Sequence, residues 1–263
     1  MEPKLGKEIM VNPRWSHDRK VAKNYAGIIG VDEAGRGCLA GPVVAGCMIL
    51  PARFFADGKN RKVTCRINDS KQFDESTREE LHHVIKYLIK KKMVFGATGV
   101  ASVEEIEEHN IVGATCLAMR RAMESASLIS DSTWVPCLSD DQDLFDGVTD
   151  SGEKWKVMVD GRRMKGLVYQ HCGLIKGDTI SLAVAMASLL AKVARDRMMK
   201  KLCNEYPGYG FSSNKGYGVP VHIEALHKHG PTIHHRPKFL RNLLNESEKE
   251  KGRSFEQTQL SLV

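Results

Sequence analysis

Four acidic residues have the types and positions that metal-assisted chemistry requires. Each ends an apolar run close to a glycine, and the four are Asp32, Glu33, Asp160 and Asp178. An unpaired carboxylate is costly to bury, so such groups are normally paired, hydrogen-bonded or bound to a cation. Carboxylate oxygens are hard ligands that suit Mg²⁺ or Mn²⁺ better than zinc. Because two such ions can activate a water and stabilise the leaving oxygen, the acids predict a site for phosphodiester hydrolysis.

Each acidic motif also has a purely structural interpretation. Asp32 and Glu33 could belong to a surface turn after an edge strand, and Asp160 could open an Asp-Gly turn. Asp178 stands where a helix begins and could be its N-cap. The recurrence favours a functional site, because the active sites of α/β proteins collect at strand ends, where several strands direct side chains into one crevice.

A flexible, positively charged turn follows the first acidic pair. It consists of Gly35, Arg36 and Gly37. Glycine lets a backbone approach a ligand closely, and arginine matches the two-oxygen geometry of a phosphate. The chain carries a net charge of +7, which suits a polyanionic partner. We therefore expect a metal ion and a phosphate to meet at this turn.

The elements that must position these residues follow from hydrophobic periodicity. Apolar, β-branched runs predict strands over residues 27–31, 42–50, 93–100, 155–159 and 168–175. Helix-spaced apolar residues, and a capping box at Ser102 and Glu105, predict helices over residues 74–92, 102–126, 179–203, 220–229 and 237–246. The fold class is α/β, with a sheet flanked by helices.

Three segments have a different character. Residues 1–24 are polar and basic and are expected to form a loosely ordered arm. Residues 131–153 hold seven acids and no lysine or arginine, which predicts a solvated acidic loop or insertion rather than a metal site. Residues 247–263 are charged and are expected to form a flexible tail.

The composition indicates the cellular compartment in which the protein is found. Seven scattered cysteines form no C-x-x-C pair, which favours free thiols in a reducing compartment. No apolar run is long enough for a membrane span, and the N-terminus lacks an apolar signal-peptide core. We therefore expect a cytoplasmic protein with no membrane association, and a monomer.

The motifs together resemble one known family, ribonuclease HII (type 2 ribonuclease H), from Tyr25 to Phe239. The matching segments occur in the family's order. They are DEAGRG with AGPVVA (32–45), DSK (69–71), VDG (159–161), KGD (176–178), ASLLAKVARD (187–196), NKGYG (214–218) with His222, and HR (235–236). Any one of these motifs is weak evidence, whereas the ordered set is highly specific.

The resemblance implies a fold and an activity. The fold would be a ribonuclease-H-like mixed sheet flanked by helices over residues 25–205, followed by a C-terminal helical, substrate-binding subdomain over residues 206–246. The activity would be a metal-dependent endonuclease that cuts the RNA strand of RNA–DNA hybrids. It would also nick 5′ of single ribonucleotides in duplex DNA, leaving 3′-hydroxyl and 5′-phosphate ends. These activities would serve RNA primer removal and ribonucleotide excision repair.

The resemblance also implies residue roles. The four acids would hold two Mg²⁺ or Mn²⁺ ions, the turn at 35–37 would contact the 2′-hydroxyl at the RNA–DNA junction, and Tyr217 would pack on the following deoxyribose. The 2′-hydroxyl is the group by which a protein distinguishes RNA from DNA. Three further positions would face phosphates or brace the site: Lys71, Ser188 and Lys192.

Some of these roles have alternatives of equal or greater weight. Lys192 and Arg195 could equally form a solvated helix end. His222 and His235 lack metal-ligand spacing, and a structural or phosphate-facing role is favoured over a catalytic one. The departures from the family pattern are Val219 after the GYG motif and Lys238 after the HR motif, and neither is one of the acids.

Three other functions are compatible with parts of the pattern. A ribonuclease HIII-like hybrid nuclease would share the fold and the acids, but the Gly-Arg-Gly turn argues against it. A DNA nuclease or transposase of the same fold would not require ribose in its substrate. A non-catalytic hybrid-binding protein is disfavoured because like charges packed together without a metal destabilise a fold.

The last five residues, Gln259, Leu260, Ser261, Leu262 and Val263, resemble the short motif by which bacterial proteins bind the replication sliding clamp. An apolar peptide on a charged tether suits docking into a pocket. Deleting residues 259–263 is expected to abolish retention of the protein on immobilised clamp in a pull-down. Retention equal to that of the intact chain would contradict this prediction.

Overall fold

The computed structural model describes residues 12–131, 133–139, 147–148 and 154–241. Within these residues one sheet is formed by β1 (Gly27–Ala34), β2 (Val43–Pro51), β3 (Phe95–Ala101), β4 (Gly147–Val148), β5 (Lys154–Asp160) and β6 (Cys172–Leu174). The strand order is β3-β2-β1-β5-β4, and β6 pairs with β5. β1 is antiparallel to β2 and parallel to β5, so the sheet is mixed, as the family resemblance implied.

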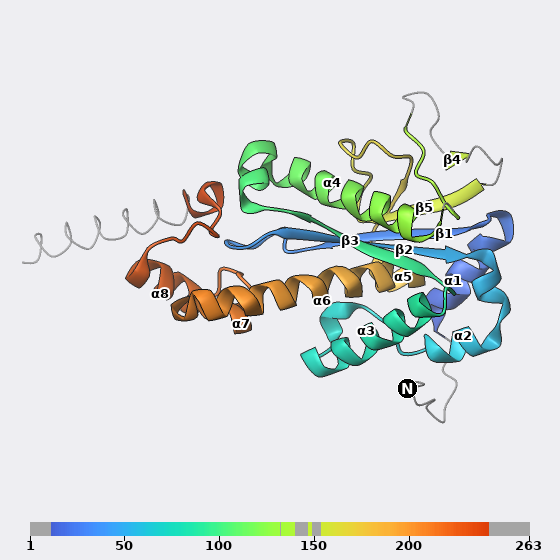
Figure 1. Cartoon of the computed structure of the whole chain (residues 1–263), viewed down its shortest axis with the longest axis horizontal. Helices are drawn as coiled ribbons and strands as arrows, with labels where there is room; N and C mark the ends of the chain where they lie inside the picture. The colour runs from blue at the N-terminus through green and yellow to red at the C-terminus, as the bar shows by residue number, and fades with distance from the viewer. Residues whose placement is uncertain (1–11, 132, 140–146, 149–153, 242–263) are drawn as a thin grey trace, which may run out of the picture.

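Helices cover both faces of the sheet (Figure 1). They are α1 (Pro13–Val21), α2 (Gly58–Val63), α3 (Glu75–Lys90), α4 (Val103–Ile129), α5 (Gly177–Ile180), α6 (Leu182–Glu205), α7 (Phe211–Asn214) and α8 (Pro220–His229). α4 lies on one face, and α6 with α3 lies on the other. None of the helices in the described residues is long and apolar enough to cross a membrane. The seven cysteines are free, as predicted.

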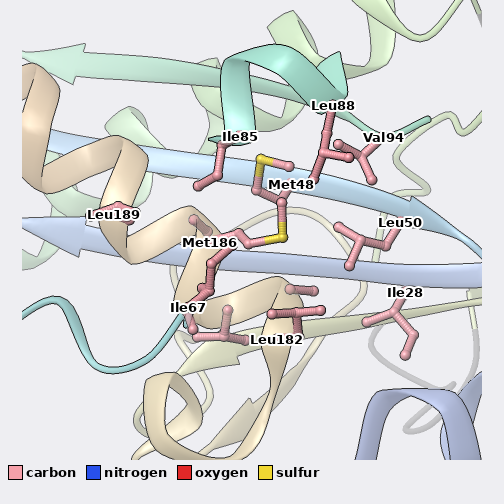
Figure 2. Packing of buried hydrophobic residues seen from close by; sticks show 14 of the residues in the cluster. Ile28, Met48, Leu50, Ile67, Ile85, Leu88, Val94, Leu182, Met186 and Leu189 are labelled. Carbon is pink, nitrogen blue, oxygen red and sulfur yellow. The ribbon is translucent and has the colours of Figure 1, made fainter. Parts of the chain in front are cut away.

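The core between α6, α3 and the sheet fixes α6 across the central strands. Figure 2 shows Leu182, Met186 and Leu189 of α6 among apolar side chains of β1, β2 and α3. Gly30 lets α6 approach, since a Cβ there would lie 2.1 Å from the Ala183 carbonyl carbon. The small residues in the first half of α6 therefore bring its backbone close to the sheet, and burying their apolar surface stabilises the arrangement.

Residues 13–24 contradict the expectation of a loosely ordered arm. Pro13 is the first residue of α1, and the Asn12 side chain accepts a hydrogen bond from the Arg14 N–H, which is a helix start signal. Trp15 is buried and packs on the Phe54 and Phe55 rings, at centroid distances of 5.3 and 5.1 Å. Residues 1–11 lie outside the described residues.

The helix predicted over residues 179–203 is interrupted at Ser181. Ser181 is extended, ends α5, and caps α6 by accepting a hydrogen bond from the Val184 N–H. The Asp18 carboxylate of α1 accepts two further bonds here, from the Ser181 hydroxyl at 3.0 Å and the Ala183 N–H at 2.9 Å. These hydrogen bonds connect α1 to the start of α6.

Two predictions around β5 need correction. The strand predicted over residues 168–175 is reduced to β6, because residues 168–170 bond instead to residues 137–139. The acidic segment 131–153 is not wholly an exposed loop, since Trp134 is buried and Gly147–Val148 pairs with β5. The rest of that segment, residues 132, 140–146 and 149–153, lies outside the described residues.

The chain after α6 has its own small core. Tyr209, Phe211 and Leu226 pack there against Met199 and Leu202 of α6. α8 has the bounds that the sequence predicted. Residues 237–241 are helical, and the remainder of that predicted helix lies outside the described residues, as do the tail at 247–263 and its clamp-like pentapeptide.

Candidate active site

Two of the predicted acids lie at the same end of two neighbouring parallel strands. In the β1–β5 pair, Val31 is opposite Val159, so Asp32 and Asp160 each follow one member of this pair. Asp178 lies in the first turn of α5 and is not its N-cap, which is Lys176. The Gly177 N–H donates to Asp160 Oδ1 at 2.6 Å, so the start of α5 is fixed beside the end of β5.

Asp32 is buried among like charges. Only 4% of the residue is exposed, and its Oδ1 accepts a hydrogen bond from the Glu33 N–H at 2.7 Å. Burial raises the pKa of Asp32 well above the usual range, and the negative charges of Glu33 and Asp160 raise it further. A hydrogen bond to Ser188 acts in the opposite direction. The field at this position therefore favours a bound cation.

Glu33 connects the acids to the Gly-Arg-Gly turn. Burial raises the pKa of Glu33, while the Arg36 guanidinium lowers it and Asp160 raises it. The nearest atoms of Arg36 and Glu33, Nη1 and Oε1, are 3.5 Å apart. Arg36 is exposed, so it partly balances the acidic charge and still faces solvent, where a phosphate could approach.

These residues suit a hard divalent cation. The described residues contain no group of three or more His, Cys, Asp or Glu side chains already arranged as a metal cage. The fit depends instead on donor chemistry, since burial and the negative charge of Asp160 raise the pKa of both Asp32 and Glu33, and all three groups present only oxygen ligands. A cation would remove the charge repulsion that this arrangement imposes.

Two buried guanidinium groups hold the turn that follows the acids. Arg236 is fully buried and donates to the carbonyls of Gly35 at 2.7 Å, Arg36 at 3.0 Å and Gly41 at 2.7 and 2.9 Å. Arg195, which is 1% exposed, donates to the carbonyls of residues 40, 42 and 215. Arg195 is therefore neither on a solvated helix face nor facing a phosphate.

The two glycines of the turn have different surroundings. Gly35 has φ +91°, and a Cβ there would lie 1.9 Å from Arg195 Nε, so any side chain would displace the guanidinium. A Cβ at Gly37 would meet no atom within 4 Å. Gly35 is therefore needed for packing, whereas the space beside Gly37 is open to a ligand.

Tyr217 lies beside the turn. It is 42% exposed and hydrogen-bonds to Cys38, which directly follows Gly37. The Leu39 N–H donates to the Gly216 carbonyl at 2.8 Å, so the two backbone segments are also joined. The structure thus brings Tyr217 and the Gly-Arg-Gly turn together, although they are far apart in the sequence.

A chain of hydrogen bonds through two buried histidines supports Tyr217. The Thr232 N–H donates to His235 Nδ1 at 2.9 Å, so a neutral His235 carries its proton on Nε2. That proton is donated to His222 Nε2 at 3.0 Å, and His222 Nδ1–H then donates to the Tyr217 carbonyl at 2.9 Å. Both histidines are structural in this arrangement, which is one of the alternatives that the sequence favoured.

The supporting residues have different positions. Ser188 of α6 contacts Asp32 and lies 3.0 Å from the Ser70 hydroxyl of the DSK motif. Lys192 is half-buried and donates to Asp196 at 2.7 Å on the next turn of α6. Lys71 lies in the short 3-10 helix at 70–72, and its side chain is outside the described part of the structure.

Sequence reasoning missed Arg14. Its side chain is buried, and its Nε donates to the Asp178 carbonyl at 2.7 Å. The signal was present in the Asn12-Pro13 pair, a helix start that would have placed Arg14 in ordered structure. The contact of Cys38 with Tyr217 had no local signal in the sequence, because it depends on tertiary structure.

The mixed sheet, the acids at the ends of its parallel central strands and the adjacent Gly-Arg-Gly turn are the features of a ribonuclease-H-like nuclease. The family model described as Ribonuclease HII matches residues 29–243. A ribonuclease HII from Fusobacterium nucleatum is 39% identical over 249 residues, covering 94% of this chain and 99% of the relative. The chain therefore belongs to the ribonuclease HII family and is a ribonuclease H, a hydrolase. Family membership supports activity on RNA–DNA hybrids.

Solved structures agree on the fold. The ribonuclease H2 of Pyrococcus horikoshii aligns with a TM-score of 0.57 at 24% identity, covering 84% of this chain and 99% of that one. The ribonuclease HII of Archaeoglobus fulgidus, solved in complex with PCNA, aligns with a TM-score of 0.54 at 21% identity, covering 80% and 93%. At these identities the likeness concerns the fold alone.

Replacing Arg236 tests the support of the turn. Arg236→Met leaves the buried carbonyls of Gly35 and Gly41, and the part-buried carbonyl of Arg36, without this donor, and each unsatisfied buried group costs on the order of 1–3 kcal/mol. We expect the free energy of unfolding to fall by about 3 kcal/mol in denaturant titrations. Arg197→Met, which removes a half-exposed ion pair with Glu79, is the control and should cost under about 1 kcal/mol. Equal losses in the two variants would contradict this role.

The histidine pair predicts a pH dependence of stability. Burial and the neighbouring His222 lower the pKa of His235 to about 4, below its ordinary 6.5. The unfolded chain therefore binds more protons as the pH falls from about 6.5 to about 4, and stability is lost across this window. In His235→Gln, the fall in unfolding free energy between pH 7.5 and 5.5 should be smaller by about 1 kcal/mol. His227→Gln, at an exposed position, should retain the wild-type dependence, and an unchanged dependence in His235→Gln would refute the prediction.

Proposed function

We propose that this enzyme is a divalent-metal-dependent endonuclease that nicks duplex DNA 5′ of an embedded ribonucleotide and also cuts the RNA strand of longer hybrids. The observation that carries the proposal is the crowding of Asp32, Glu33 and Asp160 beside a turn with an open glycine and an exposed tyrosine. The products would have 3′-hydroxyl and 5′-phosphate ends. The cellular roles would be ribonucleotide excision repair and RNA primer removal in the cytoplasm.

Asp32, Glu33, Asp160 and Asp178 would hold Mg²⁺ or Mn²⁺. When bound, such ions supply a water of lowered pKa and stabilise the leaving oxygen. The protein's own contribution is to hold the carboxylates in place. Asp160 is fixed by the Gly177 N–H, and Asp32 by the Glu33 N–H and Ser188. Orientation of this kind limits the reorganisation that the reaction requires.

Recognition of ribose would fall to the turn and to Tyr217. The open space beside Gly37 leaves room for a sugar 2′-hydroxyl to reach backbone donors. Tyr217, held by Cys38 and by the histidine chain, offers an exposed ring against which the next sugar could pack. A second ribose at that position would place a further hydroxyl against the ring, which supports a preference for an RNA–DNA junction.

The direct test uses a labelled DNA duplex with one ribonucleotide, a hybrid with several ribonucleotides and an all-DNA duplex, each with Mg²⁺, Mn²⁺ or EDTA. We expect a nick just 5′ of the ribose, dependent on metal and absent from the all-DNA control. Cutting of both duplexes would indicate a general DNA nuclease. Cutting only of hybrids with several ribonucleotides would indicate a junction-independent, ribonuclease HIII-like activity. Binding without cutting in either metal would refute the catalytic proposal.

Asp160→Asn tests the carboxylates. Asparagine keeps the shape and an oxygen that can accept from Gly177, but it removes a negative charge that Asp32 and Glu33 both experience. We expect cleavage to fall by a factor of about 10³ or more, while hybrid binding and the free energy of unfolding are kept or increased. Glu108→Gln, at an exposed position, should cleave normally. Cleavage by Asp160→Asn at the wild-type rate would show that Asp160 is not part of the catalytic site.

A further inference from the structure

A cationic hollow lies between α1 and α2, outside the candidate active site. It has a volume of about 310 Å³ and is lined by Trp15, Ser16, Arg19, Lys20, Lys23 and Arg61. No carboxylate contributes to this lining among the described residues. A second hollow of about 380 Å³ shares Arg61 with the first and is also lined by Lys59 and Lys62. The only acid there is Asp57, whose carboxylate accepts the Lys59 N–H at 2.8 Å and so caps α2.

The six cations that line the two hollows are Arg19, Lys20, Lys23, Lys59, Arg61 and Lys62. Within the described residues, none of the six has an ion-pair partner, whereas Arg197 pairs with Glu79 and Lys200 pairs with Glu75. The Nε of Arg61 is buried and has no hydrogen-bond partner in the described part of the chain. A buried, unsatisfied donor between unpaired cations is costly, and an anion would relieve both costs.

The walls of the hollow are fixed by packing. α1 directs Trp15 and Asp18 inward, where Trp15 packs on Phe54 and Phe55 and Asp18 caps α6. The outer side of the same helix carries Lys20, and Lys23 follows in the adjoining 3-10 turn. α2 begins directly after the segment that holds Phe54 and Phe55. The two cationic walls are therefore held by one aromatic cluster.

α1 also connects the hollow to the acids. Arg14, near the start of the helix, donates to the Asp178 carbonyl. At 1.5 Å of rise per residue, Lys20 lies about 9 Å further along the helix axis. One strand of a duplex carries a phosphate about every 3.4 Å along its axis, so this distance corresponds to about three nucleotides.

We infer that the hollow between α1 and α2 binds backbone phosphates of the nucleic-acid duplex a few nucleotides from the cut. This inference rests on the proposed function. Contacts from lysine and arginine to phosphates carry no sequence information, but they fix the register and orientation of the duplex. The hollow would thus help to hold the duplex in register with the acids.

The test measures binding of a duplex with one ribonucleotide by fluorescence anisotropy in EDTA, which prevents cutting, over a range of salt concentrations. The double variant Lys20→Gln/Lys23→Gln is compared with Lys86→Gln/Lys90→Gln, which removes the same charge from exposed positions on α3. In a plot of log affinity against log salt, the first variant should reduce the slope by about 1 for each lysine. Arg61→Gln should weaken binding similarly. The α3 control should match the wild type.

Each other outcome has a defined meaning. If the wild type binds and cuts the duplex but Lys20→Gln/Lys23→Gln keeps the wild-type slope, this inference is overturned and the proposed function stands. If the wild type neither binds nor cuts, the proposed function fails. Measuring the melting temperature with and without inorganic phosphate distinguishes a site that binds only small anions from one that binds the duplex. Protection by phosphate that the double variant loses, together with an unchanged duplex slope, would overturn the duplex assignment.

Discussion

The parallel pairing of β1 with β5 is the constraint on which the site depends. It brings Asp32 and Asp160 to one end of the sheet, and Glu33 follows Asp32 on the same strand. Burial and mutual repulsion make the charged forms of Asp32 and Glu33 costly. Ser188 and Arg36 offset this cost only in part, so the rest must be met by the apolar cores on the two faces of the sheet. A site in which buried carboxylates repel one another is suited to binding cations.

The turn that we propose to recognise the substrate depends on a different interaction, that of buried guanidinium groups with backbone carbonyls. Arg236 comes from the C-terminal segment and Arg195 from α6, yet both bind the loop that follows β1. Arginine can do this because its planar fork donates in several fixed directions at once. The C-terminal segment therefore completes the turn beside the acids. Tyr217 is placed there by the backbone hydrogen bond between Leu39 and Gly216 and by its own contact with Cys38.

Much of this arrangement was predictable from sequence, and the exceptions share a cause. β1, β5 and α8 have strong local periodicity, and the acids at strand ends could be paired by topology alone. Arg195 and Arg236 were beyond prediction as buried residues, because their acceptors are carbonyls that only tertiary folding supplies. α1 was missed for a different reason: its polar sequence concealed a helix that is anchored mainly by Trp15.

α1 matters because it combines structural and electrostatic roles in one short helix. Asp18 caps α6, the helix that carries Ser188 to Asp32, while Arg14 binds the backbone at Asp178. The outward side of α1 carries unpaired cations. A polyanion bound to these cations would therefore contact a helix that is hydrogen-bonded to both α5 and α6. A duplex bound as we infer would thus be connected to the acids through a few hydrogen bonds rather than through a flexible arm.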